Sequence, residues 1–301
     1  MNSVKVNRRT NTCYIDWKDA EATLQLTRAL LATRFGLDLQ LPRDRLCPAL
    51  TSRVNYIHFI KALLGKIDDK TCSDDKVIWG IDIGTGASCI YPLLGAKMHG
   101  WHFVATEVDP VSVECAKRNV SINGLDELIE VRSRTPEESS SVVEHVARER
   151  VFHFTMCNPP FFVSSKAVRK VEHMSVMHDG NPMRACMATT LEACTDGGET
   201  EFVKRMVDES TRIPLQCHWW TSLLGCKKSL RVVWDYLHGG CKSMPIGLDL
   251  TVEEGELVQG KTTRWVIAWS FFSAAEKGPD SLVVKKPDSK RRRINDGDDD
   301  D

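Results

Sequence analysis

Six short segments of this 301-residue chain are apolar on both faces and rich in β-branched or aromatic residues. Stretches with helical periodicity separate most of these segments. Strands that are apolar on both faces are typical of parallel sheets whose two faces are covered by helices. The pattern therefore predicts an α/β fold with a mainly parallel sheet. The six segments lie at residues 77–83, 101–107, 128–131, 152–158, 218–225 and 264–272.

Two amphipathic helices are expected before the first of these strands. One covers residues 17–36 and is closed by Gly36, and the other covers residues 51–64. Residues 163–196 fit neither the helical nor the strand pattern, and so long a loop in a compact domain is usually functional or disordered. From residue 274 onward Lys, Pro, Asp and Ser dominate, which predicts a disordered charged tail over residues 274–301.

The overall composition narrows the class of protein. The chain has 40 Lys and Arg against 41 Asp and Glu, so any nucleic-acid-binding surface must be local. Its eleven cysteines form no C-x-x-C pair and no Cys/His cluster with zinc spacing, which favours reduced cysteines and no metal site. The first residues lack the apolar core of a signal peptide, and no apolar run approaches the roughly 20 residues that span a bilayer. We therefore expect an intracellular, soluble protein.

A glycine turn follows the first predicted strand and precedes a helix, in the sequence Ile-Asp-Ile-Gly84-Thr-Gly86-Ala-Ser. Glycine lets the backbone approach a ligand closely, and a helix N-terminus attracts a carboxylate or a phosphate. Glu107 ends the next predicted strand, where an acid accepts hydrogen bonds from ribose hydroxyls in nucleotide-binding folds. Together Gly84, Gly86 and Glu107 predict a site for a cofactor that contains a nucleoside.

The strongest signal is Asn158-Pro159-Pro160-Phe161, directly after the fourth predicted strand. Two consecutive prolines end the strand and fix the turn at the edge of the sheet where ligands bind. The Asn158 side-chain oxygen and the Pro159 carbonyl can each accept one hydrogen of an aromatic amine and turn its lone pair towards a methyl donor. Phe161 or its neighbour Phe162 can stack on an unstacked base. We interpret this turn as a catalytic site for methylation of an amine.

These motifs together resemble those of class I amino-methyltransferases, and longer stretches resemble the methyltransferase-like protein 16 family. The resemblance covers about residues 10–273. The stretches that carry it are RVNYIH (53–58), GIDIGTGASCIYPLLGA (80–96), TEVD (106–109), MCNPPFF (156–162), GGETEFVKRM (197–206) and QGKTTRW (259–265).

The resemblance implies a class I, Rossmann-like methyltransferase fold with a mainly parallel seven-stranded sheet flanked by helices. It divides the chain into a helical N-terminal extension (1–70), which acts as a cofactor lid and contacts RNA, and a methyltransferase domain that uses S-adenosylmethionine (71–273). The implied activity is methylation of adenine N6 in U6 small nuclear RNA and in hairpins of S-adenosylmethionine synthetase messages. Structured RNA is the implied partner.

Individual roles also come from the resemblance. Arg53 is implied to reach the carboxylate of the cofactor, and Asn158 is placed at the methyl-transfer centre. The implied cofactor-binding residues are Arg53, Gly84, Gly86, Glu107 and Asn158. The implied RNA-binding residues are Lys166, Arg169, Lys170, Lys261 and Arg264.

Two alternatives remain open. The same chemistry could act on ribosomal RNA or on a glutamine of a release factor, because relatives with the Asn-Pro-Pro turn modify both. The chain could also be a cofactor-dependent RNA-binding scaffold with little catalysis. The intact Asn158–Phe162 turn argues against a scaffold, and the longer family stretches favour U6-type RNA.

The tail generates a prediction about localisation. Lys285-Lys286 and the run from Lys290 to Arg293 form a basic cluster of the kind that directs nuclear import. We expect the protein to accumulate in the nucleus, with a further population in the cytoplasm. Deleting residues 285–293 from a fluorescent fusion too large for passive diffusion should abolish the accumulation. Full nuclear enrichment of the deleted fusion would contradict the assignment.

Overall fold

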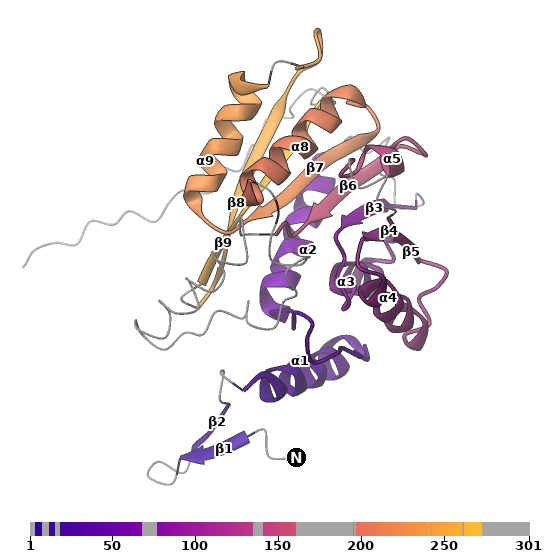
Figure 1. The fold of residues 1–301 in the computed structure, drawn as a ribbon, viewed down its shortest axis with the longest axis vertical. Coiled ribbons are helices and arrows are strands. Elements are labelled where there is room, and N and C mark those ends of the chain that lie inside the picture. The colour runs from indigo at the N-terminus through magenta and orange to yellow at the C-terminus, as the bar shows by residue number, and fades with distance from the viewer. Residues whose placement is uncertain are drawn as a thin grey trace, which may run out of the picture.

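The computed structural model contains a seven-stranded sheet whose order is β5-β4-β3-β6-β7-β9-β8 (Figure 1). All neighbours from β5 to β7 are parallel, whereas β9 runs antiparallel to both β7 and β8. The predicted class I fold is therefore confirmed. The residues that the structure describes are 4–7, 12–15, 19–67, 77–134, 141–160, 195, 197–241, 243–260 and 262–272.

All six predicted strand segments are strands, and their ends differ from the prediction by a few residues. The seventh strand, β8, lies at the edge of the sheet, and only Leu257 along it is buried. A strand with a single buried residue lacks the two-sided apolar pattern used for the prediction. The strands are β3 (Trp79–Ile83), β4 (His102–Glu107), β5 (Ile129–Ser133), β6 (Phe152–Cys157), β7 (Cys217–Leu224), β8 (Thr251–Gln259) and β9 (Thr262–Ser270).

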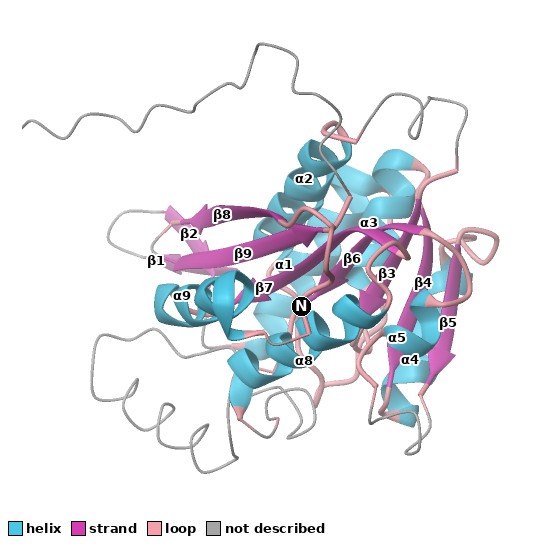
Figure 2. Cartoon of the chain, turned by 90° about the horizontal axis from the view of Figure 1, so that it is seen from above, coloured by secondary structure: helices cyan, strands magenta, loops and turns pink. Residues whose placement is uncertain are grey.

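Two hydrophobic cores lie on opposite faces of the sheet, because successive side chains of a strand point to opposite sides. Phe103 packs into one core and its neighbour Val104 into the other. Figure 2 shows the strands between α2 and α3 on one side and α8 and α9 on the other. The first core is covered by α2 (Leu50–Leu64), α3 (Ile90–His99) and α4 (Pro110–Ile122). The second is covered by α5 (Glu144–Ala147), α8 (Gly198–Arg212), α9 (Lys227–Asp235) and the π-helical turn η3 (Tyr236–Gly240). Among the described residues, no helix combines the length and apolar character needed to cross a membrane.

The N-terminal extension contains the two predicted helices. Helix α1 (Ala20–Phe35) begins where the Asp19 side chain accepts hydrogen bonds from two backbone N–H groups, and it ends at Gly36 with a left-handed φ of 60°. A two-stranded antiparallel hairpin, β1 (Val4–Asn7) and β2 (Thr12–Ile15), precedes them and was not predicted. Figure 1 shows this hairpin at the end of the molecule next to α1.

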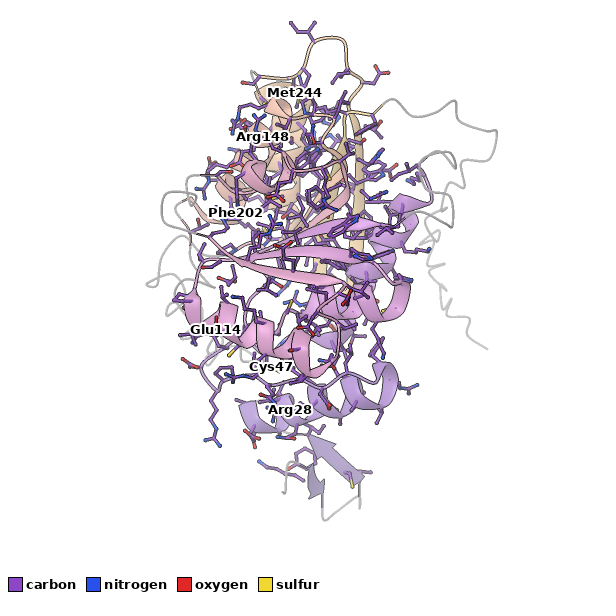
Figure 3. All side chains as sticks on the ribbon, turned by 90° about the vertical axis from the view of Figure 1, so that its right-hand side faces the viewer. Arg28, Cys47, Glu114, Arg148, Phe202 and Met244 are labelled. Carbon is purple, nitrogen blue, oxygen red and sulfur yellow. The ribbon has the colours of Figure 1, made fainter. Side chains whose placement is uncertain are left out.

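Side chains of α4 bind the segment between α1 and α2 to the sheet domain. Asn119 is fully buried; its amide oxygen accepts from Gln40 N, and its amide nitrogen donates to Gln40 O and to Ala87 O, at 2.8–2.9 Å. Arg45 forms a 2.8 Å ion pair with Asp109, the residue that caps α4. In the side view of Figure 3, Cys47 of the same segment lies between α1 and α4. The extension and the sheet domain therefore share one core.

These contacts predict that Asn119→Ala destabilises the whole molecule. The substitution removes three hydrogen bonds and leaves buried backbone groups unpaired, which should lower the free energy of unfolding by about 3 kcal/mol. Urea denaturation followed by circular dichroism measures the change. The exposed variant Lys117→Ala on the same helix should change the unfolding free energy by less than about 0.5 kcal/mol. Equal effects of the two substitutions would show that the Asn119 contacts do not stabilise the fold.

Candidate active site

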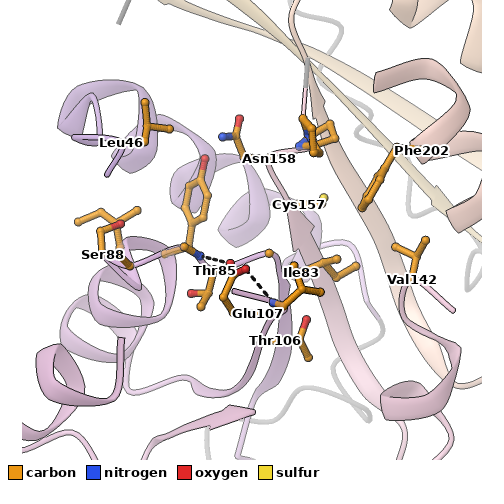
Figure 4. A pocket seen from close by; sticks show the side chains of 18 of the residues that line it. Leu46, Ile83, Thr85, Ser88, Thr106, Glu107, Val142, Cys157, Asn158 and Phe202 are labelled. Carbon is orange, nitrogen blue, oxygen red and sulfur yellow. Dashed lines mark hydrogen bonds between the residues drawn. The ribbon is translucent and has the colours of Figure 1, made fainter. Parts of the chain in front are cut away.

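A cavity of about 290 Å³ lies at the carboxyl ends of β3, β4 and β6, near the lower end of the usual range for small-molecule sites. Seven of the predicted site residues line it together. Figure 4 shows Asn158 and Glu107 in this cavity, with Leu46 and Phe202 on opposite sides. The seven residues are Arg53, Gly84, Gly86, Glu107, Asn158, Pro159 and Pro160.

The turn after β3 requires glycine at two positions. Gly84 and Gly86 have φ angles of 69° and 65°, which other residues rarely adopt. A Cβ atom on Gly84 would meet no other protein atom within 4 Å, so the space beside it is open to a ligand. The turn is held by Thr85 N, which donates to the Thr106 carbonyl at 2.9 Å. The glycine turn therefore presents bare backbone to the cavity.

The Glu107 carboxylate links the ends of β3 and β4. Its side chain is 7% exposed and accepts hydrogen bonds from the N–H groups of Gly86 (2.9 Å), Val108 (2.7 Å) and Asp109 (3.0 Å). Two of these bonds hold the carboxylate over its own turn, and the third fixes the glycine turn. Each carboxylate oxygen has more than one lone-pair direction, so Glu107 can also accept from a ligand hydroxyl.

Asn158 is the first residue after β6, and its amide projects into the cavity (Figure 4). Its Oδ1 atom is buried and has no hydrogen-bond partner among the described residues. A buried acceptor without a partner costs about 1–3 kcal/mol, so such atoms are uncommon outside functional sites. Pro159 and Pro160 also line the cavity, as expected for a turn that fixes the direction of Asn158.

Helix α2 brings Arg53 to the cavity from outside the sheet. Its Nη1 atom donates to the Tyr91 hydroxyl at 2.7 Å, and its guanidinium lies 5.2 Å from the centre of the Tyr91 ring. The Nε atom of Arg53 is buried without a partner among the described residues. Leu46 and Pro48, just before α2, complete this wall. The extension therefore forms one side of the cavity.

A buried carboxylate lies beneath the glycine turn. Asp82 is fully buried, and neither of its oxygens forms a hydrogen bond with a described residue. Burial raises the pKa of Asp82 to about 7, against the opposing effects of the nearby Thr85 hydroxyl and the Arg53 guanidinium. The free energy of the fold therefore contains a cost for the ionised form of Asp82.

The other predicted site residues have different outcomes. Arg264 is on β9 and does not line the cavity. Its guanidinium interacts electrostatically with Arg53 and Glu199. Burial, followed by the charge of Arg53, lowers its pKa. The predicted residues that lie outside the described part of the chain are Phe161, Lys166, Arg169, Lys170 and Lys261.

Several cavity residues were not predicted to be site residues. Phe202 and Arg205 come from α8, and Val142 precedes α5. Phe202 and Arg205 belong to the stretch 197–206 that resembles the family, but nothing in their helical or apolar contexts assigned any of the three to the cavity. Only the packing of α5 and α8 against the sheet brings them to the cavity. Other lining residues that were not predicted include Leu46, Pro48, Tyr91, Arg134 and Thr195.

The strand order, the glycine turn, the acid that ends β4 and the Asn-Pro-Pro turn define a Rossmann-like methyltransferase. The chain belongs to the RNA methyltransferase family, whose model matches residues 2–273.

Known proteins of this family resemble the chain along most of its length. It is 38% identical over 288 residues to the RNA N(6)-adenosine-methyltransferase METTL16 of Homo sapiens, covering 93% of this chain and 47% of that protein. It is 34% identical over 268 residues to the U6 small nuclear RNA (adenine-(43)-N(6))-methyltransferase of Drosophila melanogaster, covering 86% and 82%. The chain thus spans about half the length of the human relative.

Solved structures of the family share the fold. The hMettl16 catalytic domain in complex with MAT2A 3'UTR hairpin 1 superposes with a TM-score of 0.75 at 36% identity, covering 90% of this chain and 87% of that one. The N-terminal domain of human METTL16 in complex with SAH gives a TM-score of 0.68 at 35% identity, covering 89% and 88%.

The raised pKa of Asp82 predicts a pH-dependent effect of Asp82→Asn. A folded-state pKa of about 7 lies above the value of about 3.9 in an unfolded chain, so the wild-type protein loses stability as the pH rises between these values. The asparagine variant cannot ionise at this position. The unfolding free energy of the variant minus that of wild type should therefore be about 2–3 kcal/mol more positive at pH 8 than at pH 5, so the variant gains relative stability as the pH rises.

Urea unfolding of both proteins at the two pH values measures this difference. Other titrating groups are common to both proteins and cancel in the comparison. A difference that does not change with pH would show that Asp82 titrates normally.

Proposed function

We propose that this protein is an RNA adenine-N6 methyltransferase that uses S-adenosylmethionine. The observation that carries the proposal is the buried Oδ1 atom of Asn158, which has no partner among the described residues and lies in one cavity with the glycine turn and Glu107. An acceptor held in this way has no structural task among the described residues. An amine donor in the cavity would satisfy it.

The residues of the cavity fit S-adenosylmethionine. Arg53 offers its Nε–H, which has no partner in the described part of the chain, to a carboxylate, and the open backbone beside Gly84 admits a ligand. Glu107 has the acceptor capacity for ribose hydroxyls, and the ionised form of Asp82 would be favoured by a cationic ligand. When bound, the cofactor supplies a methyl group on a positively charged sulfur.

The chemistry assigned to the chain is orientation of the amine. The adenine N6 lone pair is delocalised into the ring, so the amine is a weak nucleophile. Asn158 Oδ1 and the Pro159 carbonyl can each accept one of its hydrogens, which turns the lone pair out of the ring plane and stabilises positive charge as it develops on nitrogen. These acceptors are already fixed by the turn, so little reorganisation is needed when the reaction occurs.

The names of the relatives support structured RNA as the substrate. The Drosophila relative is named for adenine 43 of U6 small nuclear RNA, and the human domain has been solved with an mRNA hairpin. We therefore propose U6 small nuclear RNA as the main substrate and mRNA hairpins as further ones. Of the predicted RNA-binding residues, Arg264 lies in the described part of the chain; it is half-buried near Arg53, and we propose that it contacts the RNA backbone.

Ribosomal RNA methylation and catalytically weak RNA binding remain the alternatives. Incubation with labelled S-adenosylmethionine and either U6 RNA or ribosomal RNA, followed by mapping of the modified base, separates them. Label in U6 adenine supports the proposal. Label in ribosomal RNA alone would replace the substrate, and tight RNA binding without label would favour the scaffold.

The assignment of Asn158 predicts a specific loss in Asn158→Ala. If Asn158 holds the adenine amine, folding and RNA binding should persist while methyl transfer at saturating cofactor and RNA falls by about 100-fold or more. Thermal unfolding, RNA titration and single-turnover methylation measure the three properties. The exposed variant Lys117→Ala should match wild type in all of them.

Near-normal methylation by a folded Asn158→Ala protein would place the chemistry elsewhere. A loss that merely follows the unfolded fraction would mean that Asn158 only shapes the turn.

A further inference from the structure

We propose that Tyr56 of helix α2 is a positioning residue for the catalytic turn, acting on Asn158 through the backbone of Cys157. The role rests on the proposed methyl transfer. It follows from an interruption in the sheet beside the turn and from the hydroxyl groups that bridge it.

The backbone pairing between β6 and β7 stops short of the cavity. It joins Phe152 to Cys217 and Phe154 to Trp219. Beyond this point no further backbone pairs join the two strands, although both are described to their ends at Cys157 and Leu224. The last three residues of β6, which lead directly into Asn158, therefore lack the regular ladder to β7 on that side.

Side-chain hydroxyls replace the missing pairs. Thr221 N donates to Thr155 Oγ1 at 2.8 Å, and Thr221 Oγ1 donates to the Thr155 carbonyl at 2.5 Å. The Tyr56 hydroxyl lies 2.6 Å from Thr221 Oγ1 and accepts from Cys157 N at 3.4 Å. All the side chains concerned are buried.

The direction of this hydrogen-bond chain follows from counting protons. Each hydroxyl has one hydrogen to donate. Because Thr221 Oγ1 gives its hydrogen to the Thr155 carbonyl, Tyr56 must donate to Thr221 and can therefore accept from Cys157. The chain runs from the Cys157 amide through Tyr56 and Thr221 back to Thr155. Without the Tyr56 hydroxyl, the buried Cys157 N–H would have no acceptor in this chain.

The Tyr56 hydroxyl thus binds Cys157, the last residue before the catalytic amide, which also pairs with Ile83 of β3. Two prolines restrict the turn on the other side of Asn158. The direction of the amide is therefore set by Cys157 on one side and Pro159 on the other. A displacement of about 1 Å at a reacting centre can lower the rate by about 100-fold, so small movements of Cys157 matter.

Tyr91 of helix α3, whose partner Arg53 lies on α2 one turn before Tyr56, provides a matched contrast. Tyr91 is also a buried tyrosine, and its ring packs against that of Tyr56 edge-to-face at 5.4 Å. Its hydroxyl accepts from Arg53, which faces the cofactor end of the cavity. The two neighbouring hydroxyls therefore serve different parts of the site. Removing the Tyr56 hydroxyl should change the methylation rate, and removing the Tyr91 hydroxyl should change the cofactor Kd.

The experiment removes one hydroxyl at a time from the full chain. In Tyr56→Phe we expect single-turnover methylation of U6 RNA at saturating cofactor to fall about 10-fold, while the Kd for S-adenosylmethionine stays within about 2-fold of wild type. In Tyr91→Phe we expect the opposite, a weaker cofactor Kd with a smaller effect on the saturated rate. A purely structural role would lower the saturated rate and raise the cofactor Kd in both variants, in line with the loss of thermal stability.

Thr221 tests the pathway. Thr221→Val should reproduce the rate loss of Tyr56→Phe, and the double variant should lose little more, because both changes break the same chain. Thr221→Ser keeps the hydroxyl and should therefore retain a rate close to that of wild type. Additive losses in the double variant would overturn the proposed chain.

The outcomes separate this role from the proposed function. A wild-type protein without turnover on any RNA overturns the proposed function and the role together. Wild-type turnover with an unchanged saturated rate in folded Tyr56→Phe overturns only the role of Tyr56.

Discussion

The shared edge of parallel strands is the constraint on which the site depends. Strands β3, β4 and β6 run in the same direction, so their carboxyl ends meet at one place. The glycine turn, Glu107 and Asn158 each follow or end one of these strands. At this edge the ladder ends, and backbone groups can bind side chains or ligands. The common direction of these strands therefore brings the glycine turn, Glu107 and Asn158 together in one cavity.

The N-terminal extension completes this edge. Helix α2 contributes Arg53 to the cavity wall and Tyr56 to the interrupted part of the sheet, and the segment before it is held by Asn119 and Arg45. These contacts are polar and mostly buried, so they specify one position of the extension more sharply than apolar packing would. The extension is therefore part of the site.

The main elements could be predicted because their signals are local. Two-sided apolar segments identified six strands, and consecutive prolines identified the Asn158 turn. The edge strand β8 and the hairpin strand β2 lacked such signals, because only Leu257 of β8 is buried and β2 is mostly exposed. Phe202 and Arg205 also escaped prediction, since a helical residue facing a cavity resembles one facing a core.

The sequence by itself determined the class of fold, the glycine turn, the acid after it and the amide of the catalytic turn. Each depends on backbone preferences within a few residues: positive φ at Gly84, fixed φ at Pro159, and two-sided burial of the strands. Only the tertiary structure decided that Tyr56 meets Thr221, 165 positions away, and that Asp82 is left without a hydrogen-bond partner among the described residues. Such contacts depend on how distant elements pack, and hydrogen bonding and desolvation of a buried group are set by neighbours that sequence spacing does not reveal.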